Sequence, residues 1–126
     1  MSDRTRITRV ELHVFRFEVE DLGLPEHGAA GVGNVEFRKG GRLPTTRFAV
    51  TIDTADGARG EYVTHWVGTP AALGQALMLA PHLLGRDPDR REQIFDDLKR
   101  ELRAYDRMGQ GPLDIALWDL AGKRLG

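Results

Sequence analysis

Several residue types that would point to a particular chemistry are scarce or missing in this chain. It contains no cysteine, which excludes a disulfide scaffold and thiol catalysis. Its single serine, Ser2, lies at an N-terminus where we expect fraying, so a Ser-His-Asp triad is excluded as well. No apolar run approaches the ~20 residues of a membrane-spanning helix, and the charged, then alternating N-terminus is unlike a signal peptide.

An excess of charge of one sign is also lacking. The 18 basic and 19 acidic side chains leave a net charge of −1, which gives no field to attract nucleic acid or an anionic membrane. The 4 histidines are widely spaced and form no HExxH pair, so the sequence predicts no metal site. We therefore expect a cytoplasmic domain that binds neither nucleic acid nor membrane, and no metal ion of its own.

The pattern of apolar residues carries most of the information in this sequence. A chain of 126 residues is long enough for one domain with its own core. The first half has strand character and the second half has helical character. This order predicts an α+β fold, with a three-stranded antiparallel meander followed by a small bundle of about three helices.

The three strands are expected at residues 6–20, 45–54 and about 58–65, with the turn ADG between the last two. In the second strand Phe48, Val50 and Ile52 alternate as one face. In the first strand the apolar phase changes by one residue between Val14 and Phe15. That change predicts either a bulge or a strand covered on both faces.

Two helix start signals follow, at Thr69-Pro70 and at Asp87-Pro88. The first predicted helix has an apolar stripe made of Leu73, Ala76, Leu77 and Ala80. The second is expected to run to Gly109, and its apolar side would consist of Ile94, Phe95, Leu98, Leu102 and Tyr105. The opposite side of this helix, which includes Arg91, is predicted to be solvated surface.

The last helix is expected to begin at Gly111-Pro112 and to have two apolar faces. One face consists of Leu113, Ala116, Leu117, Leu120 and Ala121, and the second consists of Ile115, Trp118 and Leu125. Asp119 and Lys123 lie between the faces at the favourable i,i+4 spacing. Because one face can pack on the domain's own sheet, the other face calls for a further partner.

Two loops are candidates for a ligand site. Residues 21–43 are rich in glycine and place Glu26 beside His27. The segment after the third strand gathers Tyr62, His65 and Trp66, and aromatic groups with a few polar ones are typical of small-molecule pockets. The alternative interpretation is that Tyr62 and Trp66 are packing residues and His65 is incidental.

The stretch GPLDIALWDLAGKRLG, residues 111–126, resembles the helix that closes the N-terminal domain in the mandelate racemase and muconate lactonizing enzyme group of the enolase superfamily. Residues 47–61 resemble the second strand, turn and third strand of that domain, and residues 83–98 resemble the start of its long helix. The resemblance covers essentially the whole chain. The residues that match the motif of the last helix are Asp114, Ala116, Leu117, Trp118, Asp119, Leu120, Gly122 and Lys123.

This resemblance implies that residues 1–126 are an N-terminal capping domain whose C-terminal modified TIM barrel is absent from the chain. In the family the barrel holds Mg²⁺ and the acid/base residues, which remove the proton α to a carboxylate in racemisation, cycloisomerisation or dehydration. The resemblance therefore assigns no catalytic residue to this chain. The expected partners are the barrel, a small carboxylate substrate in the whole enzyme and, through self-association, a homo-oligomer.

The capping domain of the family contributes substrate choice and water exclusion through two loops. The resemblance thus makes His27, Tyr62, His65 and Trp66 candidates for substrate contact, and Ile115, Trp118 and Leu125 the face toward the barrel. Where family members often have a small residue after Gly-x-Gly-Glu, this chain has a tyrosine, which implies a differently shaped pocket wall. The alternative function is a self-sufficient α+β module that binds a ligand or a protein.

Overall fold

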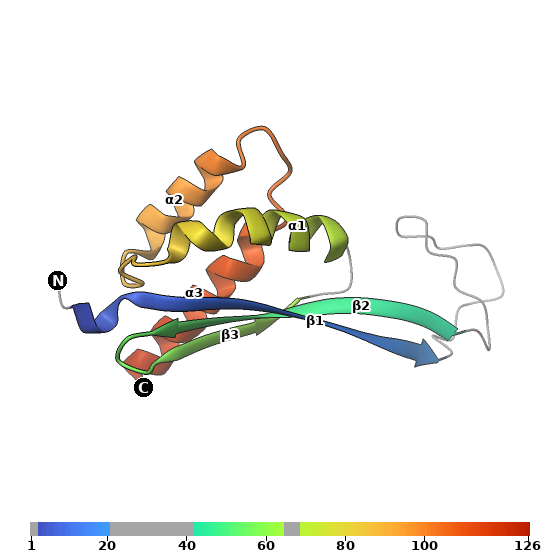
Figure 1. The fold of residues 1–126 in the computed structure, drawn as a ribbon, viewed down its shortest axis with the longest axis horizontal. Helices are drawn as coiled ribbons and strands as arrows, with labels where there is room; N and C mark the ends of the chain where they lie inside the picture. Colours follow the sequence, from blue (N-terminus) through green and yellow to red (C-terminus); the bar gives the residue numbers. More distant parts are fainter. Residues whose placement is uncertain (1–2, 21–41, 65–68) are drawn as a thin grey trace.

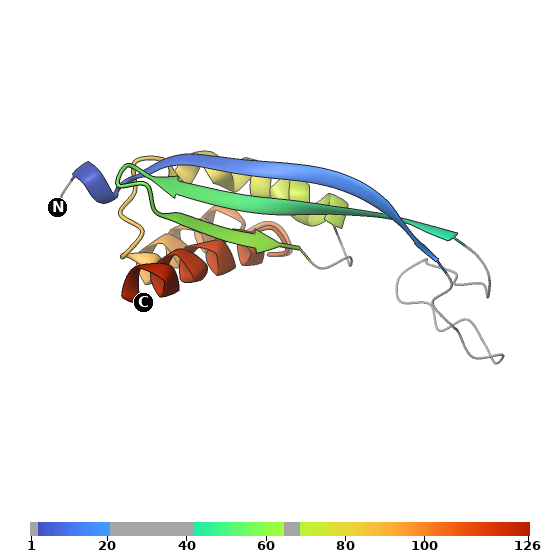
Figure 2. The same ribbon diagram turned by 90° about the horizontal axis from the view of Figure 1, so that it is seen from below.

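The computed structural model describes residues 3–20, 42–64 and 69–126, and it confirms the α+β prediction. A short 3-10 turn, η1 (Asp3–Thr5), precedes β1 (Ile7–Glu20), β2 (Arg42–Thr54) and β3 (Arg59–Val63). The three strands form an antiparallel sheet in the order β1-β2-β3. The helices lie on one face of this sheet (Figures 1 and 2). They are α1 (Thr69–Leu79), the 3-10 turn η2 (Ala80–Leu83), α2 (Arg91–Glu101) and α3 (Gln110–Leu125).

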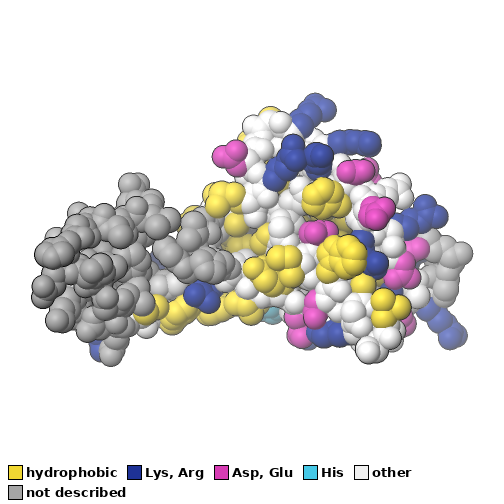
Figure 3. All heavy atoms as spheres, turned by 180° about the vertical axis from the view of Figure 1, so that it is seen from behind, with side chains coloured by type: hydrophobic (Ala, Val, Ile, Leu, Met, Phe, Trp, Pro, Cys, Tyr) yellow, Lys and Arg dark blue, Asp and Glu magenta, His cyan; other side chains and the backbone are white. Residues whose placement is uncertain are grey.

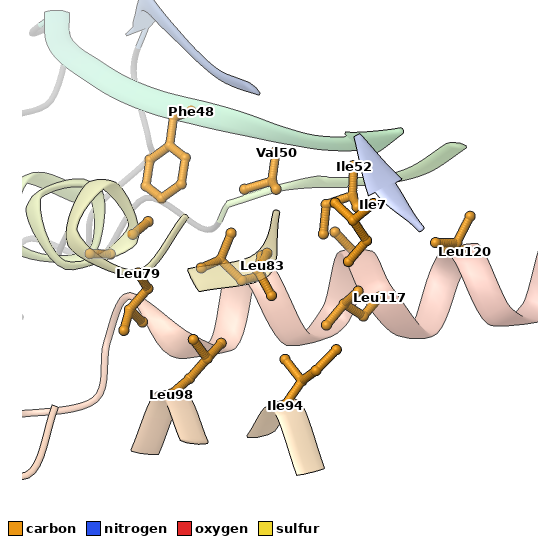
Figure 4. Close-up of a cluster of buried hydrophobic side chains, with 14 of the residues drawn as sticks. Ile7, Phe48, Val50, Ile52, Leu79, Leu83, Ile94, Leu98, Leu117 and Leu120 are labelled. Carbon is orange, nitrogen blue, oxygen red and sulfur yellow. The ribbon is translucent and has the colours of Figure 1, made fainter. Parts of the chain in front are cut away.

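The core lies between the helices and the inward face of β2, as the alternation in β2 predicted. Phe48, Val50 and Ile52 are each 0% exposed. The close-up in Figure 4 shows them pointing from the sheet toward leucines of the helical layer. Val10 and Leu12 lie opposite Ile52 and Val50 in the ladder, so they share this face and pack against the same cluster.

The phase change in β1 has a different cause from the ones the sequence suggested. From Arg9 to Glu20 the β1–β2 register runs without a break, and the only irregularity lies between Ile7 and Arg9. The hairpin of β1 and β2 extends past the helices (Figures 1 and 2). Val14 is 52% exposed and Phe15 is 41% exposed, so the end of the strand is open on both faces. Both predictions, a bulge at Val14 and cover on both faces, were therefore wrong.

Two details of the helices also differ from prediction. In α1 Ala76 is buried and Leu73 packs against the core, as predicted. Leu77 is exposed instead, and Ala72 and Leu79 complete the buried face. Helix α2 is shorter than predicted at both ends. Asp87 instead forms a turn, because its backbone oxygen accepts from Arg90 N–H at 3.2 Å.

The apolar side predicted for the second helix is correct in part. Ile94, Leu98 and Leu102 are buried, as predicted. Phe95 is 39% exposed and Tyr105 is 57% exposed, so neither belongs to the core. Because α2 ends at Glu101, Tyr105 lies beyond the helix and no longer follows its periodicity.

Helix α3 lies very close to the edge strand β3, and a glycine makes that approach possible. A Cβ atom added to Gly60 would lie 2.0 Å from the carbonyl oxygen of Ala116 and 2.7 Å from Cβ of Leu120. No real side chain fits at such distances, so only glycine allows β3 to contact α3 in this way. The five residues predicted for the inner face of α3 are all buried: Leu113, Ala116, Leu117, Leu120 and Ala121.

Candidate functional site

The outer face of α3 is the most conspicuous unpaired apolar surface near the described core. Ile115 is 43% exposed, Trp118 is 55% exposed and Leu125 is 88% exposed, while the inner face of the same helix is buried. Figure 3 views the molecule from this side and shows hydrophobic side chains gathered among charged ones. The sequence prediction of a helix with two apolar faces is therefore confirmed.

Trp118 is held in place by an arginine from the neighbouring helix. The guanidinium carbon of Arg91, the first residue of α2, lies 4.5 Å from the centroid of the Trp118 ring. A cation over an indole face at this distance is attracted by the ring quadrupole. The side predicted to be solvated is exposed at its other members, Glu92, Asp96, Lys99, Arg100 and Arg103, whereas Arg91 is half-buried by this contact. This stack ties α2 to α3 at the centre of the exposed surface.

Two shallow hollows flank the Trp118 ring, each of about 300 Å³. Both contain Arg91, Glu92 and Trp118 in their walls. The first is completed by Asp89, Arg90 and Gln93, and the second by Phe95, Asp96 and Asp114. A projecting aromatic ring between two hollows is suited to an interlocking contact with another protein surface.

The second hollow is acidic, and one of its carboxylates is partly desolvated. Burial raises the pKa of Asp114 above its usual value, and the charge of Arg91 offsets part of that increase. Glu92 and Asp96 add two further carboxylates to the same wall. A partner that brings an apolar side chain and a basic group would satisfy both parts of this hollow.

Polar contacts along the edge of α3 fix the direction in which its outer face points. Oδ2 of Asp119 accepts a hydrogen bond from the backbone N–H of Glu61 at 2.7 Å and lies 2.7 Å from Nζ of Lys123. Lys123 also donates to Oε2 of Glu61 at 3.1 Å. At the end of the helix, Arg124 donates to both carboxylate oxygens of Asp56, at 3.0 and 2.8 Å. The predicted Asp119–Lys123 pair is thus present, and it also binds β3.

Asp114 and Asp119 should affect stability in opposite ways as the pH changes. The raised pKa of Asp114 means that the folded state holds its proton more tightly than the unfolded state, so stability falls as pH rises above 3.8 toward the folded value. The hydrogen bond from Lys123, followed by that from Glu61 N–H, lowers the pKa of Asp119. Its contribution is therefore present above 3.8 and is lost as pH falls below it.

We expect Asp114→Asn to raise the melting temperature at neutral pH, and Asp119→Asn to lower it. The differences should shrink toward the acid end of a series of thermal melts, where both carboxyl groups are protonated in the folded and unfolded states. The two substitutions are matched, since both remove one charge from α3. Equal shifts of the same sign would contradict the assigned causes.

The residues predicted to contact substrate fall into two groups. Tyr62 lies on β3 opposite Val50, half-buried, and packs against the core, which is what the packing interpretation of this residue requires. His27, His65 and Trp66 lie outside the described residues. Their role in substrate contact, and that of Tyr62, stays a prediction.

Some features of this surface could not be read from the sequence. Arg91 and Phe95 contribute to this surface because α2 packs against α3 there. The way two helices pack is a feature of tertiary structure, which the pattern of one helix does not reveal. Within residues 3–20, 42–64 and 69–126, no group of three or more His, Cys, Asp or Glu side chains could hold a metal ion. No helix in those same ranges is long and apolar enough to cross a membrane.

Comparison with known proteins gives consistent matches. Residues 41–126 match the family described as mandelate racemase / muconate lactonizing enzyme, N-terminal domain. A curated relative, the cis-3-hydroxy-L-proline dehydratase of Roseibium aggregatum, is 34% identical over 84 residues, which are 61% of this chain and 23% of the relative.

Two solved structures resemble almost the whole chain. D-glucarate dehydratase from Agrobacterium tumefaciens, complexed with magnesium, has a TM-score of 0.70 and 25% identity over 98% of this chain. L-talarate dehydratase from Polaromonas sp. JS666, complexed with Mg and L-glucarate, has a TM-score of 0.67 and 27% identity over 96% of this chain. This chain covers only 31% and 33% of the two solved chains.

Proposed function

Since this chain belongs to the mandelate racemase / muconate lactonizing enzyme family as its N-terminal domain, we propose that it is the substrate-capping and specificity domain of a Mg²⁺-dependent enzyme. That enzyme would remove the proton α to a carboxylate of a small substrate, and racemisation, cycloisomerisation or dehydration would follow; the three relatives named above are dehydratases. The chain would supply no catalytic residue and would act by shaping and closing a site completed by a C-terminal barrel.

The observation that carries this proposal is the outer face of α3. Trp118 and its neighbours form an exposed, interlocking surface of the kind that is covered in an assembled protein. The relatives of known structure are about three times as long as this chain, which covers 31% and 33% of them. We infer that the remaining part of such a polypeptide, the barrel, covers this face.

The described residues do not fit a magnesium site. Mg²⁺ is held by several oxygen ligands, usually with one or two carboxylates among them. The described carboxylates form no cluster that could hold a metal ion, and several of them are already engaged with Arg59, Arg124 or Lys123. We therefore assign Mg²⁺ to the barrel and place no step of the reaction on this chain.

The contribution of this chain to the reaction would be choice of substrate and exclusion of water. We propose that the segments holding His27 and His65-Trp66 face the substrate, with Tyr62 at the end of the strand that leads to the second segment. Closing a site against water strengthens the electrostatic interactions inside it, which favours the charge that develops when a proton is removed α to a carboxylate. In this arrangement the loops would set specificity, and the barrel would set the chemistry.

A chimaera tests the proposed function. The aligned third of the Agrobacterium D-glucarate dehydratase is replaced by this chain, and exchange of the α-proton for solvent deuterium is followed by NMR in D₂O with Mg²⁺ and D-glucarate. We expect measurable exchange by the chimaera and none by the isolated chain or by the dehydratase without its first third. Exchange catalysed by the isolated chain would refute the proposal.

A further inference from the structure

The outer edge of β1 offers a second interaction surface, remote from the outer face of α3. In the order β1-β2-β3, the strand β1 pairs only with β2. Ile7 is covered on its free side, since its N–H donates to Arg86 O at 3.0 Å and its carbonyl accepts from Gly85 N–H at 2.8 Å. Among the described residues, no other backbone hydrogen bond joins β1 to anything except β2.

Alternate residues of an edge strand point their N–H and C=O groups away from the sheet, where another strand can bind them. Natural edges are commonly protected by charged side chains, lysine above all, by proline or by a bulge. The strand ITRVELHVFRFEVE has neither lysine nor proline, and its single irregularity lies at its start. It does carry charged side chains, but Arg16 and Glu18 are of opposite sign and can therefore pair with a second copy. Figure 2 shows β1 as the outermost strand, with its later half extending past the helices.

The exposed half of this edge is also apolar. Phe15 is 41% exposed and Phe17 is 36% exposed, and their rings stack with centroids 6.1 Å apart. Arg47 of β2 lies over the Phe17 ring at 5.3 Å, which holds that ring on the outer face of the sheet. An edge that pairs with no second strand among residues 3–20, 42–64 and 69–126, and that has exposed aromatic rings, suits a partner that supplies both a strand and an apolar surface.

We propose that a second copy of this chain pairs with the first along β1, antiparallel and centred on Phe17. With a two-fold axis perpendicular to the joined sheet, each Phe17 faces its counterpart, and each Phe15 faces Val19 of the other copy. On the opposite face, each Arg16 lies across from Glu18 of the other copy. Opposite charges and aromatic or β-branched residues are the favourable cross-strand pairs.

Three alternative registers are worse for reasons visible in the sequence of the strand. Centring the pair on Arg16 or on Glu18 would place like charges directly opposite each other, which destabilises a sheet. Centring it on Val10 would match Arg9 with Glu11, but it would also engage Ile7, whose edge groups are already bound. The register centred on Phe17 avoids both problems.

This dimer does not use the outer face of α3, because β1 and α3 are different elements, so the two surfaces can be tested separately. The absence of cysteine makes a direct test possible. In the proposed register Phe17→Cys would bring the two Cα atoms to about 4.5–5.5 Å, which is within the range of about 4.4–6.8 Å that a disulfide needs. We expect a cross-linked dimer on non-reducing gels after mild oxidation.

Two further cysteine variants serve as controls, one for the register of the strands and one for cross-linking by random collision. In Val14→Cys the two thiols would lie on the same edge but about 20 Å apart, six residues along the strand. Val63→Cys, on β3, tests cross-linking by random contact. It is matched to Val14→Cys because Val63 and Val14 are both 52% exposed. We expect little cross-linking from either. Cross-linking of Val14→Cys or Val63→Cys to the same extent as Phe17→Cys would overturn the proposal.

Charge reversal provides a second readout on the otherwise unmodified chain. By analytical ultracentrifugation the wild type should form dimers in a concentration-dependent way, and Arg16→Glu should weaken them at least tenfold because it faces Glu18 with a like charge. The double variant Arg16→Glu/Glu18→Arg should restore the dimer in part, because Glu18→Arg also removes the pair in which Arg42 donates to Glu18 Oε2 at 3.1 Å. Thermal melts should confirm that all three chains fold. A wild type that stays monomeric at high concentration, failure of the double variant, or dimers abolished by Trp118→Asp instead would each refute the β1 interface.

Discussion

Gly60→Ala should destabilise this domain by about 3 kcal/mol or more, at the upper end of the range for overpacked sites. The added Cβ would lie 2.0 Å from Ala116 O, 2.7 Å from Leu120 Cβ and 3.0 Å from Leu120 N. Two of these three atoms belong to the backbone of α3, which cannot move away without the whole helix. The strand and the helix must therefore separate, and the buried face of α3 would lose contact with the sheet.

Gly122→Ala is the matched control for this substitution. Gly122 is exposed on α3, the helix that Gly60 contacts, and a Cβ there would meet nothing within 4 Å. Alanine is favoured over glycine in a helix interior by about 1 kcal/mol, so this variant should be as stable as the wild type or more stable. Denaturant unfolding of both variants decides the matter. If Gly60→Ala unfolds at the same midpoint as the wild type, the close contact between β3 and α3 is wrong.

The periodicity of the sequence was sufficient to predict those parts of the fold in which one apolar face of a strand or helix packs against one neighbouring layer. Phe48, Val50 and Ile52 alternate because one face of β2 packs against the helical layer, and the inner face of α3 follows helical spacing over its whole length. The predictions failed where the chain leaves that simple arrangement. The end of β1 extends past the helical layer, so its apolar residues follow no buried face.

The candidate site shows the same division. Trp118 and Ile115 could be predicted because their exposure follows from the phase of a single helix. The stacking of Arg91 on Trp118 depends on how α2 crosses α3, which no local pattern specifies. The requirement for glycine at position 60 likewise comes from the approach of a helix distant in sequence, and the flanking residues of β3 give no sign of it.

Trp118→Asp should separate this domain from the barrel that we propose as its partner. Tryptophan is the residue whose truncation most often costs about 2 kcal/mol or more at an interface, and here it would be replaced by a charge. In the isolated chain the same change should cost little, because Trp118 is 55% exposed and its main described contact is the guanidinium of Arg91. The loss should therefore appear in docking and not in folding.

Leu77→Asp is the control, since Leu77 is 58% exposed on α1 and lies outside the outer face of α3. It introduces the same charge at a site of nearly equal exposure. Neither variant should prevent folding of the isolated chain, which thermal melts can confirm.

The most direct test of the capping role is thermal unfolding, by calorimetry, of the chimaera that joins this chain to the remainder of the Agrobacterium D-glucarate dehydratase. We predict one cooperative transition for the unmodified chimaera and for Leu77→Asp, and two separate transitions for Trp118→Asp. Two independent transitions in the unmodified chimaera, or one unchanged transition in Trp118→Asp, would contradict the assignment of the outer face of α3 as the surface that docks on the barrel.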